Sequence, residues 1–356
     1  MTARALFFAL ACAALSCAGA AGSPGGRDEP LRERASLGAL AAPSARLELS
    51  EPSVVPAAAI AAAPSAAPTQ PTASLAFVGD MAMILPIAAH LDGAEQPGKP
   101  RPAGFPFHAV AERLRSYDLL VGNLECVVAD RGTPRAERTL KASLATPKAL
   151  LDAGFDAVSV ANNHALDLSW PGFYDMLARL DAAGLPRAGA LGAEDRGAHV
   201  VLEAKGIRVA IVGHFLRDPA LALRDVERAA QKADVTIVFM HWGAEYQVEV
   251  LEDQRALARA LIDHGADAIV GAHPHVVQPD ELYQGKLISY SLGNFVFPLM
   301  WKPGTHNGAL LELDVAKQGV VGHRYRRVAL DDTGAPAFVG DATKAPPLAD
   351  GPSGKL

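Results

Sequence analysis

Cysteine is scarce in this chain, and its scarcity excludes one source of stability. The sequence has 3 cysteines, of which Cys12 and Cys17 lie in an apolar N-terminal segment and only Cys126 lies beyond it. The folded part therefore cannot form an internal disulfide, and its stability must come from a hydrophobic core. With 356 residues, 50% of them hydrophobic, the chain is long enough to build a substantial core.

Basic runs are also missing from the sequence. The formal net charge is −6 at pH 7, and no block of lysine and arginine stands out. Binding to a phosphate backbone requires a basic surface, so we expect no nucleic-acid partner. The apolar run at residues 6–15 is too short to span a bilayer.

That short apolar run has the features of an export signal. Arg4 supplies a positive charge just before it. Residues 14–17, Ala-Leu-Ser-Cys, resemble a bacterial lipobox, which would make residues 1–17 a signal peptide and leave Cys17 lipidated. Ordinary cleavage near residues 18–22 is the alternative. Both interpretations predict an exported protein, either a membrane-anchored lipoprotein or a periplasmic or cell-surface protein.

The composition divides the rest of the chain into three parts. Residues 18–73 are rich in Ala, Pro, Ser and Gly and contain no aromatic residue. Such a segment cannot bury enough apolar surface to offset its ordering entropy, so it predicts a disordered linker. A single domain is expected over residues 74–340, followed by a disordered tail at residues 341–356.

The domain is organised around two histidines two residues apart. The apolar run at residues 268–270 predicts a buried strand, and His273-Pro274-His275 follows it after two residues. Proline removes a backbone donor and fixes φ, so the strand should end there and leave the pair on a rigid loop. Neutral imidazole is the commonest metal-binding side chain, which makes this loop a candidate metal site.

Other predicted strands also end in polar residues. Apolar runs at residues 75–78, 119–121, 157–161 and 235–240 lead respectively into Asp80, Glu125, Asn162-Asn163-His164 and His241. In an α/β sheet such strand ends gather along one edge. Further strands are expected at residues 208–213, 287–291, 309–315 and 324–330, and helices at 107–117, 146–153, 171–183 and 252–264.

The side chains at these strand ends suit a pair of metal ions. Five or six mixed oxygen and nitrogen ligands exceed what one zinc ion needs, and they match two divalent ions about 4 Å apart that share a carboxylate. Imidazole ligands favour Mn, Fe or Zn over Mg or Ca, which prefer oxygen ligands.

Six motifs in order make the chain resemble the bacterial capsule-synthesis CapA (PgsA) family of poly-γ-glutamate systems, which is similar in motif order to calcineurin-like metallophosphoesterases. The motifs are FVGD at residues 77–80, GNLE at 122–125, SVANNHALD at 159–167, HWGAEY at 241–246, GAHPHVVQP at 271–279 and YSLGNFVF at 290–297.

The resemblance implies a fold and a site. The fold is a four-layer α/β/β/α sandwich of the calcineurin-like metallophosphoesterase type. His164 takes the place of the general acid, and Ala82 stands where those enzymes have a histidine, which implies weaker binding of one metal. The implied metal ligands are Asp80, Glu125, Asn163, His241, His273 and His275, and the predicted substrate-binding residues are Asn123, Asn162 and Asn294.

Two functions remain open at this point. The first is an exported metal-dependent hydrolase that acts on a phosphoester or an anionic envelope polymer. The second is a non-catalytic assembly or anchoring factor for an acidic capsule polymer. Both place the chain with other capsule-synthesis membrane proteins and at the membrane through its N-terminal lipid or signal.

Overall fold

The computed structural model describes residues 71–94, 100–189, 191, 197–215, 218–299 and 302–340. The predicted signal peptide with Cys17, the C-terminal tail and nearly all of the predicted linker lie outside the described residues. None of the helices within the described part combines the length and apolar character needed to cross a bilayer.

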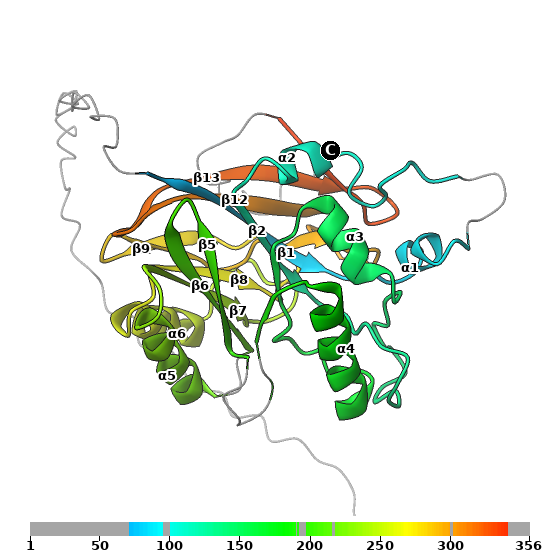
Figure 1. Cartoon of the computed structure of the whole chain (residues 1–356), viewed down its shortest axis with the longest axis horizontal. Helices are drawn as coiled ribbons and strands as arrows, with labels where there is room; N and C mark the ends of the chain where they lie inside the picture. Colours follow the sequence, from blue (N-terminus) through cyan, green and yellow to red (C-terminus); the bar gives the residue numbers. More distant parts are fainter. Residues whose placement is uncertain are drawn as a thin grey trace, which may run out of the picture. The chain divides into compact units, whose positions relative to one another are not determined.

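Eight strands form the first sheet (Figure 1). They are β1 (Ala73–Met81), β2 (Leu119–Leu124), β3 (Ala157–Ser159), β4 (Arg187–Ala188), β11 (Asn294–Val296), β12 (Asn307–Ala316), β13 (Gly319–Leu330) and β14 (Pro336–Phe338). The order is β14-β13-β12-β1-β2-β3-β4, and β11 pairs with β1. β1 to β4 and β11 are parallel, whereas β12 to β14 form an antiparallel extension.

Six strands form the second sheet. They are β5 (His199–Ala204), β6 (Ile207–Phe215), β7 (Val235–His241), β8 (Ala268–Ala272), β9 (Asp280–Tyr283) and β10 (Lys286–Ser289). The order is β5-β6-β7-β8-β10-β9, with parallel pairing in the centre and antiparallel pairing at both edges.

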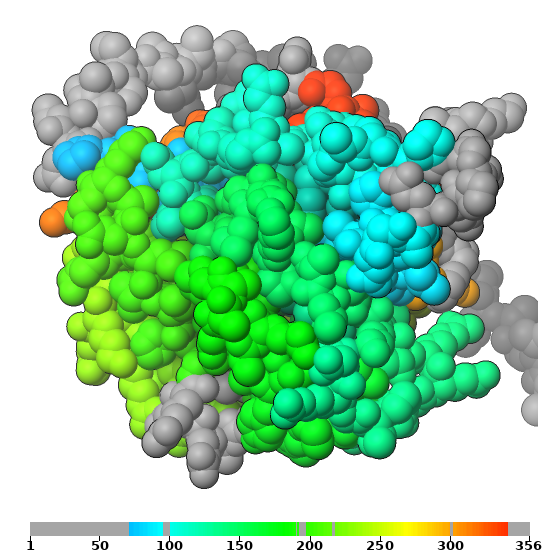
Figure 2. Space-filling model, turned by 45° about the vertical axis from the view of Figure 1, so that its right-hand side comes forward, coloured from blue at the N-terminus to red at the C-terminus, as the bar shows by residue number. Residues whose placement is uncertain are grey.

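Helices cover the outer faces of the two sheets. α5 (Pro219–Ala230) and α6 (Glu252–Asp263) pack on the second sheet, and α1 (Ile87–Leu91), α2 (Ala111–Leu114), α3 (Thr146–Ala153) and α4 (Ser169–Ala183) contribute to the core over the first. In Figure 2 the cyan and green segments, from the end of β1 through α4, cover most of the visible face.

The strand period explains how one apolar run serves two cores. In β1, Leu75 and Phe77 enter the core between the sheets, whereas Ala76 and Val78 enter the core under the first group of helices. A third core joins the second sheet to α5 and α6. A strand buried on both faces reads as a continuous hydrophobic run, as it does here. Three cores between four layers confirm the predicted α/β/β/α sandwich.

Several predicted boundaries need correction. The helix expected at 107–117 is only Ala111–Leu114, because the backbone from Pro102 to Val110 forms successive turns. The pair Thr146-Pro147 predicts a helix with Thr146 as its N-cap. α3 begins at Thr146 itself, so this residue does not cap it. The helix end expected at Gly154 is confirmed, with a φ of 103° that favours glycine.

Glu312 on β12 holds a charged network on the first sheet. It is buried and accepts hydrogen bonds from Tyr117, from Arg326 and, at 2.8 Å, from Arg324. Burial alone would raise the pKa of Glu312, but these hydrogen bonds, with that of Tyr117 the largest, hold the pKa below its ordinary value of 4.5.

We expect Glu312→Gln to destabilise the fold by about 1–3 kcal/mol at pH 7, since it removes charge-assisted hydrogen bonds. A carboxyl whose pKa falls on folding stabilises the native state above its unfolded pKa, and this stabilisation is lost as pH falls through the folded pKa. The difference between wild type and Glu312→Gln in the free energy of unfolding, measured with urea, should therefore decrease below about pH 4.5. Asp314→Asn, at a more exposed partner of Arg324, is the control and should change stability by less than about 1 kcal/mol. A difference that stays constant down to acid pH would contradict the prediction.

Candidate metal centre

The parallel strands bring the predicted ligands to one edge, as the sequence indicated. Asp80 lies near the end of β1, and Glu125 follows β2 directly. His241 is the last residue of β7, and His273 follows β8. The candidate ligand atoms form two groups, and within each group all atoms lie within 4.8 Å of one another. One group is Glu125, His241 and His273, and the other is Asp80, Glu125 and His275, so Glu125 belongs to both.

Close backbone approaches fix this edge. A Cβ on Gly79, just before Asp80, would lie 1.9 Å from the carbonyl oxygen of Gly293, so only glycine fits beside β11. The loop after β8 is held in an unusual conformation, with φ of 99° at His273 and 59° at His275. Pro274 accepts a hydrogen bond from the backbone N–H of Tyr246. Left-handed backbone at non-glycine residues is a form of strain that collects at functional sites.

The two carboxylates are both fully buried but differ in charge balance. Asp80 accepts hydrogen bonds from Asn123 Nδ2 at 2.7 Å and from the backbone N–H of His273 at 3.0 Å. Burial alone would raise the pKa of Asp80, but the hydrogen bond and charge of His275 hold it below its ordinary value. Burial, and next the charge of Asp80, raise the pKa of Glu125 well above its ordinary value.

The three histidines also differ. Burial, followed by the charge of His273, lowers the pKa of His241 well below its ordinary value, and burial likewise lowers that of His273. Burial would lower the pKa of His275 too, but Asp80 outweighs it and raises the value. Neutral rings at His241 and His273 are the form that can bind a metal.

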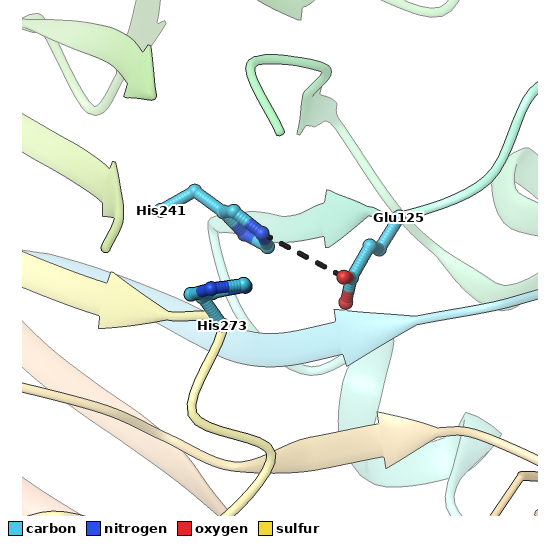
Figure 3. A group of neighbouring side chains, drawn as sticks. All are labelled: Glu125, His241 and His273. Atoms are coloured by element: carbon cyan, nitrogen blue, oxygen red, sulfur yellow. Dashed lines mark ion pairs between the residues drawn. The ribbon is translucent and has the colours of Figure 1, made fainter. Parts of the chain in front are cut away.

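Glu125 provides the test of whether these residues fit a cation. Both of its carboxylate oxygens are buried, and neither has a hydrogen-bond donor among the described residues; His273 Nδ1 is in the same situation. Figure 3 shows Glu125, His241 and His273 pointing toward one another, with His241 Nε2 3.6 Å from Glu125 Oε1. A buried carboxylate without partners is costly unless a cation neutralises it. The donor set therefore fits divalent metal.

The loop after β3 brings two more predicted residues to the centre. Asn163 Oδ1 lies 2.8 Å from His241 Nε2, and His164 Nε2 lies 3.9 Å from Glu125 Oε1. His164 Nδ1 lies 2.9 Å from Asp167 Oδ2, which also accepts the backbone N–H of Leu140. The sequence prediction did not assign Asp167, although it stands three residues after His164 in the quoted motif.

Asn123, Asn162 and Asn294 also reach the centre, but their amides are buried and form hydrogen bonds within the protein, except that Asn162 Oδ1 has no partner among the described residues. Asn162 Nδ2 donates to Asn123 Oδ1 and to the carbonyl oxygen of Leu124. Asn294 Oδ1 lies 3.0 Å from His275 Nδ1. Their contact with a substrate stays a prediction; the observed contacts orient candidate ligands.

Glu245 lies near the centre although the sequence did not indicate it, whereas His214 lies away from the centre. Glu245 is exposed, and its charge acts on Glu125, His273 and His275. His214 lies within β6 and contacts Asp225 of α5 at 3.0 Å, so it belongs to neither ligand group.

The fold and the clustered side chains define a four-layer α/β protein with a candidate metal centre. The chain belongs to the family of bacterial capsule synthesis proteins, PGA_cap, whose sequence model matches residues 74–299. The resemblance inferred from the motifs is thereby confirmed.

Two Bacillus relatives agree with this family assignment. The chain is 32% identical over 268 residues to the PGA biosynthesis protein CapA of Bacillus subtilis (strain 168), which covers 69% of this chain and 68% of that protein. It is 32% identical over 240 residues to the capsule biosynthesis protein CapA of Bacillus anthracis, covering 60% and 58%. Among solved structures it is similar to the calcineurin-like phosphoesterase YfkN from Bacillus subtilis, with 13% identity, a TM-score of 0.43, and coverage of 73% and 91%.

Proposed function

We propose that this chain is an exported metal-dependent hydrolase that acts on a phosphoester or an anionic envelope polymer during capsule or poly-γ-glutamate biosynthesis. The observation that carries the proposal is Glu125: a fully buried carboxylate with no hydrogen-bond donor in the part of the chain that the structure describes, shared by two groups of candidate ligands. The family membership supports the capsule context.

The proposed cofactor is a pair of divalent ions, Mn, Fe or Zn. Asp80, Glu125 and His275 would hold one, and Glu125, Asn163, His241 and His273 would hold the other. When bound, such ions supply Lewis acidity and lower the pKa of water. Ala82 adds no ligand to the first group, so we expect weaker binding there.

His164 is the proposed general acid. Its ring is partly exposed, with 23% of the side chain accessible, and Asp167 fixes its orientation through Nδ1. The proton on Nε2 would then be directed toward the centre and could pass to a leaving group. His164 lies outside both ligand groups, so its role can be separated from metal binding.

A non-catalytic assembly or anchoring factor is the second candidate. The names of both Bacillus relatives refer to biosynthesis rather than hydrolysis, which favours a role in building the polymer. Metal analysis of the purified chain, combined with a screen of phosphodiester and γ-glutamyl amide substrates, tests the two. Bound metal without hydrolysis of any probe would favour the assembly factor, and absence of bound metal would overturn the proposed centre.

Anchoring through Cys17 is part of the proposal. A lipidated Cys17 would place the chain at the membrane beside other capsule-synthesis membrane proteins, so Cys17→Ser should release it or leave it unprocessed. We expect wild type to incorporate a labelled fatty acid and to pellet with membranes, and the variant to lose the label. Equal membrane retention of both proteins, with no label on wild type, would support ordinary signal cleavage instead. Cys12→Ser is the matched control.

A further inference from the structure

Two buried side-chain amides, those of Asn162 and Asn123, form a hydrogen-bonded relay whose direction is fixed at both ends. The carbonyl oxygen of Leu124 can only accept, so the group 2.9 Å away on Asn162 is Nδ2. The same Nδ2 donates to Asn123 Oδ1 at 3.2 Å. At the other end Asp80 Oδ1, a carboxylate oxygen, lies 2.7 Å from Asn123 and requires a donor there. Both ends therefore assign Asn123 Nδ2 to the side that faces Asp80.

This orientation decides which nitrogen of His241 carries the proton. Asn123 Nδ2 also lies 3.1 Å from His241 Nδ1, so Nδ1 accepts a hydrogen from it. In the neutral ring the proton is then on Nε2, where Asn163 Oδ1 accepts it at 2.8 Å. Nε2 is the nitrogen that faces Glu125 Oε1 at 3.6 Å. The lone pair needed by a metal is therefore turned away from Glu125.

His275 has the opposite arrangement. Its Nδ1 lies 3.0 Å from Asn294 Oδ1 and 3.3 Å from Asp80 Oδ2. Asn294 Nδ2 donates to the carbonyl oxygen of Thr305, which fixes Oδ1 toward His275. With two acceptors beside it, Nδ1 carries a proton, so the neutral ring leaves Nε2 bare, 3.8 Å from Glu125 Oε1.

We propose that Asn123 and Asn294 are positioning residues that preset the two ligand groups in opposite ways. Asn294 holds His275 in the tautomer whose bare Nε2 can bind metal. Asn123 holds His241 in the tautomer whose Nε2 is protonated and cannot bind metal. The inference rests on the proposed metal centre. It adds that filling the group containing His241 breaks the relay, whereas filling the group containing His275 does not.

Filling the second group moves one proton without changing the charge of the ring. The proton leaves Nε2 of His241 to water, and one from water reaches Nδ1. The new Nδ1–H opposes Asn123 Nδ2–H, so Asn123 must either turn its amide or lose its bond to His241. Either response gives up at least one hydrogen bond, which corresponds to roughly a two- to tenfold loss of affinity.

Nitrogen-15 NMR of the full chain tests the tautomers directly. The protein is labelled at histidine, stripped of metal with a chelator and examined at pH 8, and the rings are assigned with His241→Ala and His275→Ala. We expect a bare Nδ1 and a protonated Nε2 at His241, and the reverse at His275. Zn²⁺ should shift His275 Nε2 while Nδ1 of that ring stays protonated, whereas at His241 the proton should move from Nε2 to Nδ1. A protonated Nδ1 at His241 in the metal-free protein would overturn the proposal, as would a bare Nδ1 at His275.

Two matched variants separate positioning from general damage. Asn123→Leu removes the donor to His241 and should raise Zn²⁺ affinity of the second group roughly two- to tenfold in calorimetry. Asn294→Leu removes the acceptor from His275 and should lower affinity of the first group roughly 10–100-fold. A purely structural role would lower affinity in both variants, and that outcome would refute the proposal. If wild type binds no Zn²⁺ the proposed function fails, while the metal-free spectra still decide the tautomers.

Discussion

Glu125→Gln should remove metal from the chain and at the same time raise the melting temperature of the metal-free protein. Glutamine keeps the shape of the side chain but loses the charge that both ligand groups share. Loss of an outer-shell partner costs roughly 10–100-fold in metal affinity, so loss of a shared ligand should cost more. The buried charge is unfavourable without metal, as the raised pKa of Glu125 indicates, and its removal should stabilise the apoprotein.

Metal content by elemental analysis and thermal unfolding after chelation give the two readouts. Glu245→Gln is the matched control, because Glu245 acts on the same histidines by charge but is exposed and belongs to neither ligand group. It should change metal content little. Full metal occupancy in Glu125→Gln would refute the centre as described.

His164→Ala should leave metal bound and slow hydrolysis by about two to four orders of magnitude, the usual contribution of a general acid. The ring lies 3.9 Å from Glu125 and outside both ligand groups, so metal content should not fall. Asp167→Asn should give a smaller loss, because it leaves the His164 ring in place and changes the group that orients Nδ1.

The substrate in this test is whichever phosphodiester or amide the screen shows to be hydrolysed by wild type. His264→Ala is the control, since His264 lies at the end of α6 and bonds to the carbonyl oxygen of Ala260. If His164→Ala supports capsule export and hydrolyses the probe as wild type does, His164 is not a general acid and the assembly function gains support.

The sequence predicted the positions of the candidate ligands better than the extent of the elements. Asp80, His241 and His273 come at the ends of long apolar runs, and parallel pairing brings such ends to one edge within each sheet. The packing of the two sheets, which brings Asp80 to the two histidines, is seen only in the structure. The length of α2 was overestimated, because the apolar spacing of Val110 and Leu114 fits a helix that would include residues whose backbone forms turns. β5 and α5 were not predicted, although Asp218 caps α5 through the backbone N–H of Leu221.

The roles of the asparagines could not be read from the sequence. A polar residue after a strand is equally compatible with contact to a substrate or to a neighbouring side chain. Only the three-dimensional arrangement shows that Asn123 meets both Asp80 and His241, which are far apart in sequence. Asp167 is similar: its contact with His164 depends on the turn that follows β3.

The ligands come from both halves of the sandwich, which gives metal a mechanical consequence. Asp80 and Glu125 lie in or directly after strands of the first sheet, whereas His241, His273 and His275 lie at the end of or after strands of the second. The interface between the sheets is otherwise an apolar core. Bound metal would connect the two sheets at one rim, so the sheets could separate there only after the metal is released. A ligand that binds only the native state adds to the stability of that state. Chelation should therefore speed amide hydrogen exchange at the rim, near Asp80 and Ala272, well before it affects the far ends of β1 and β8.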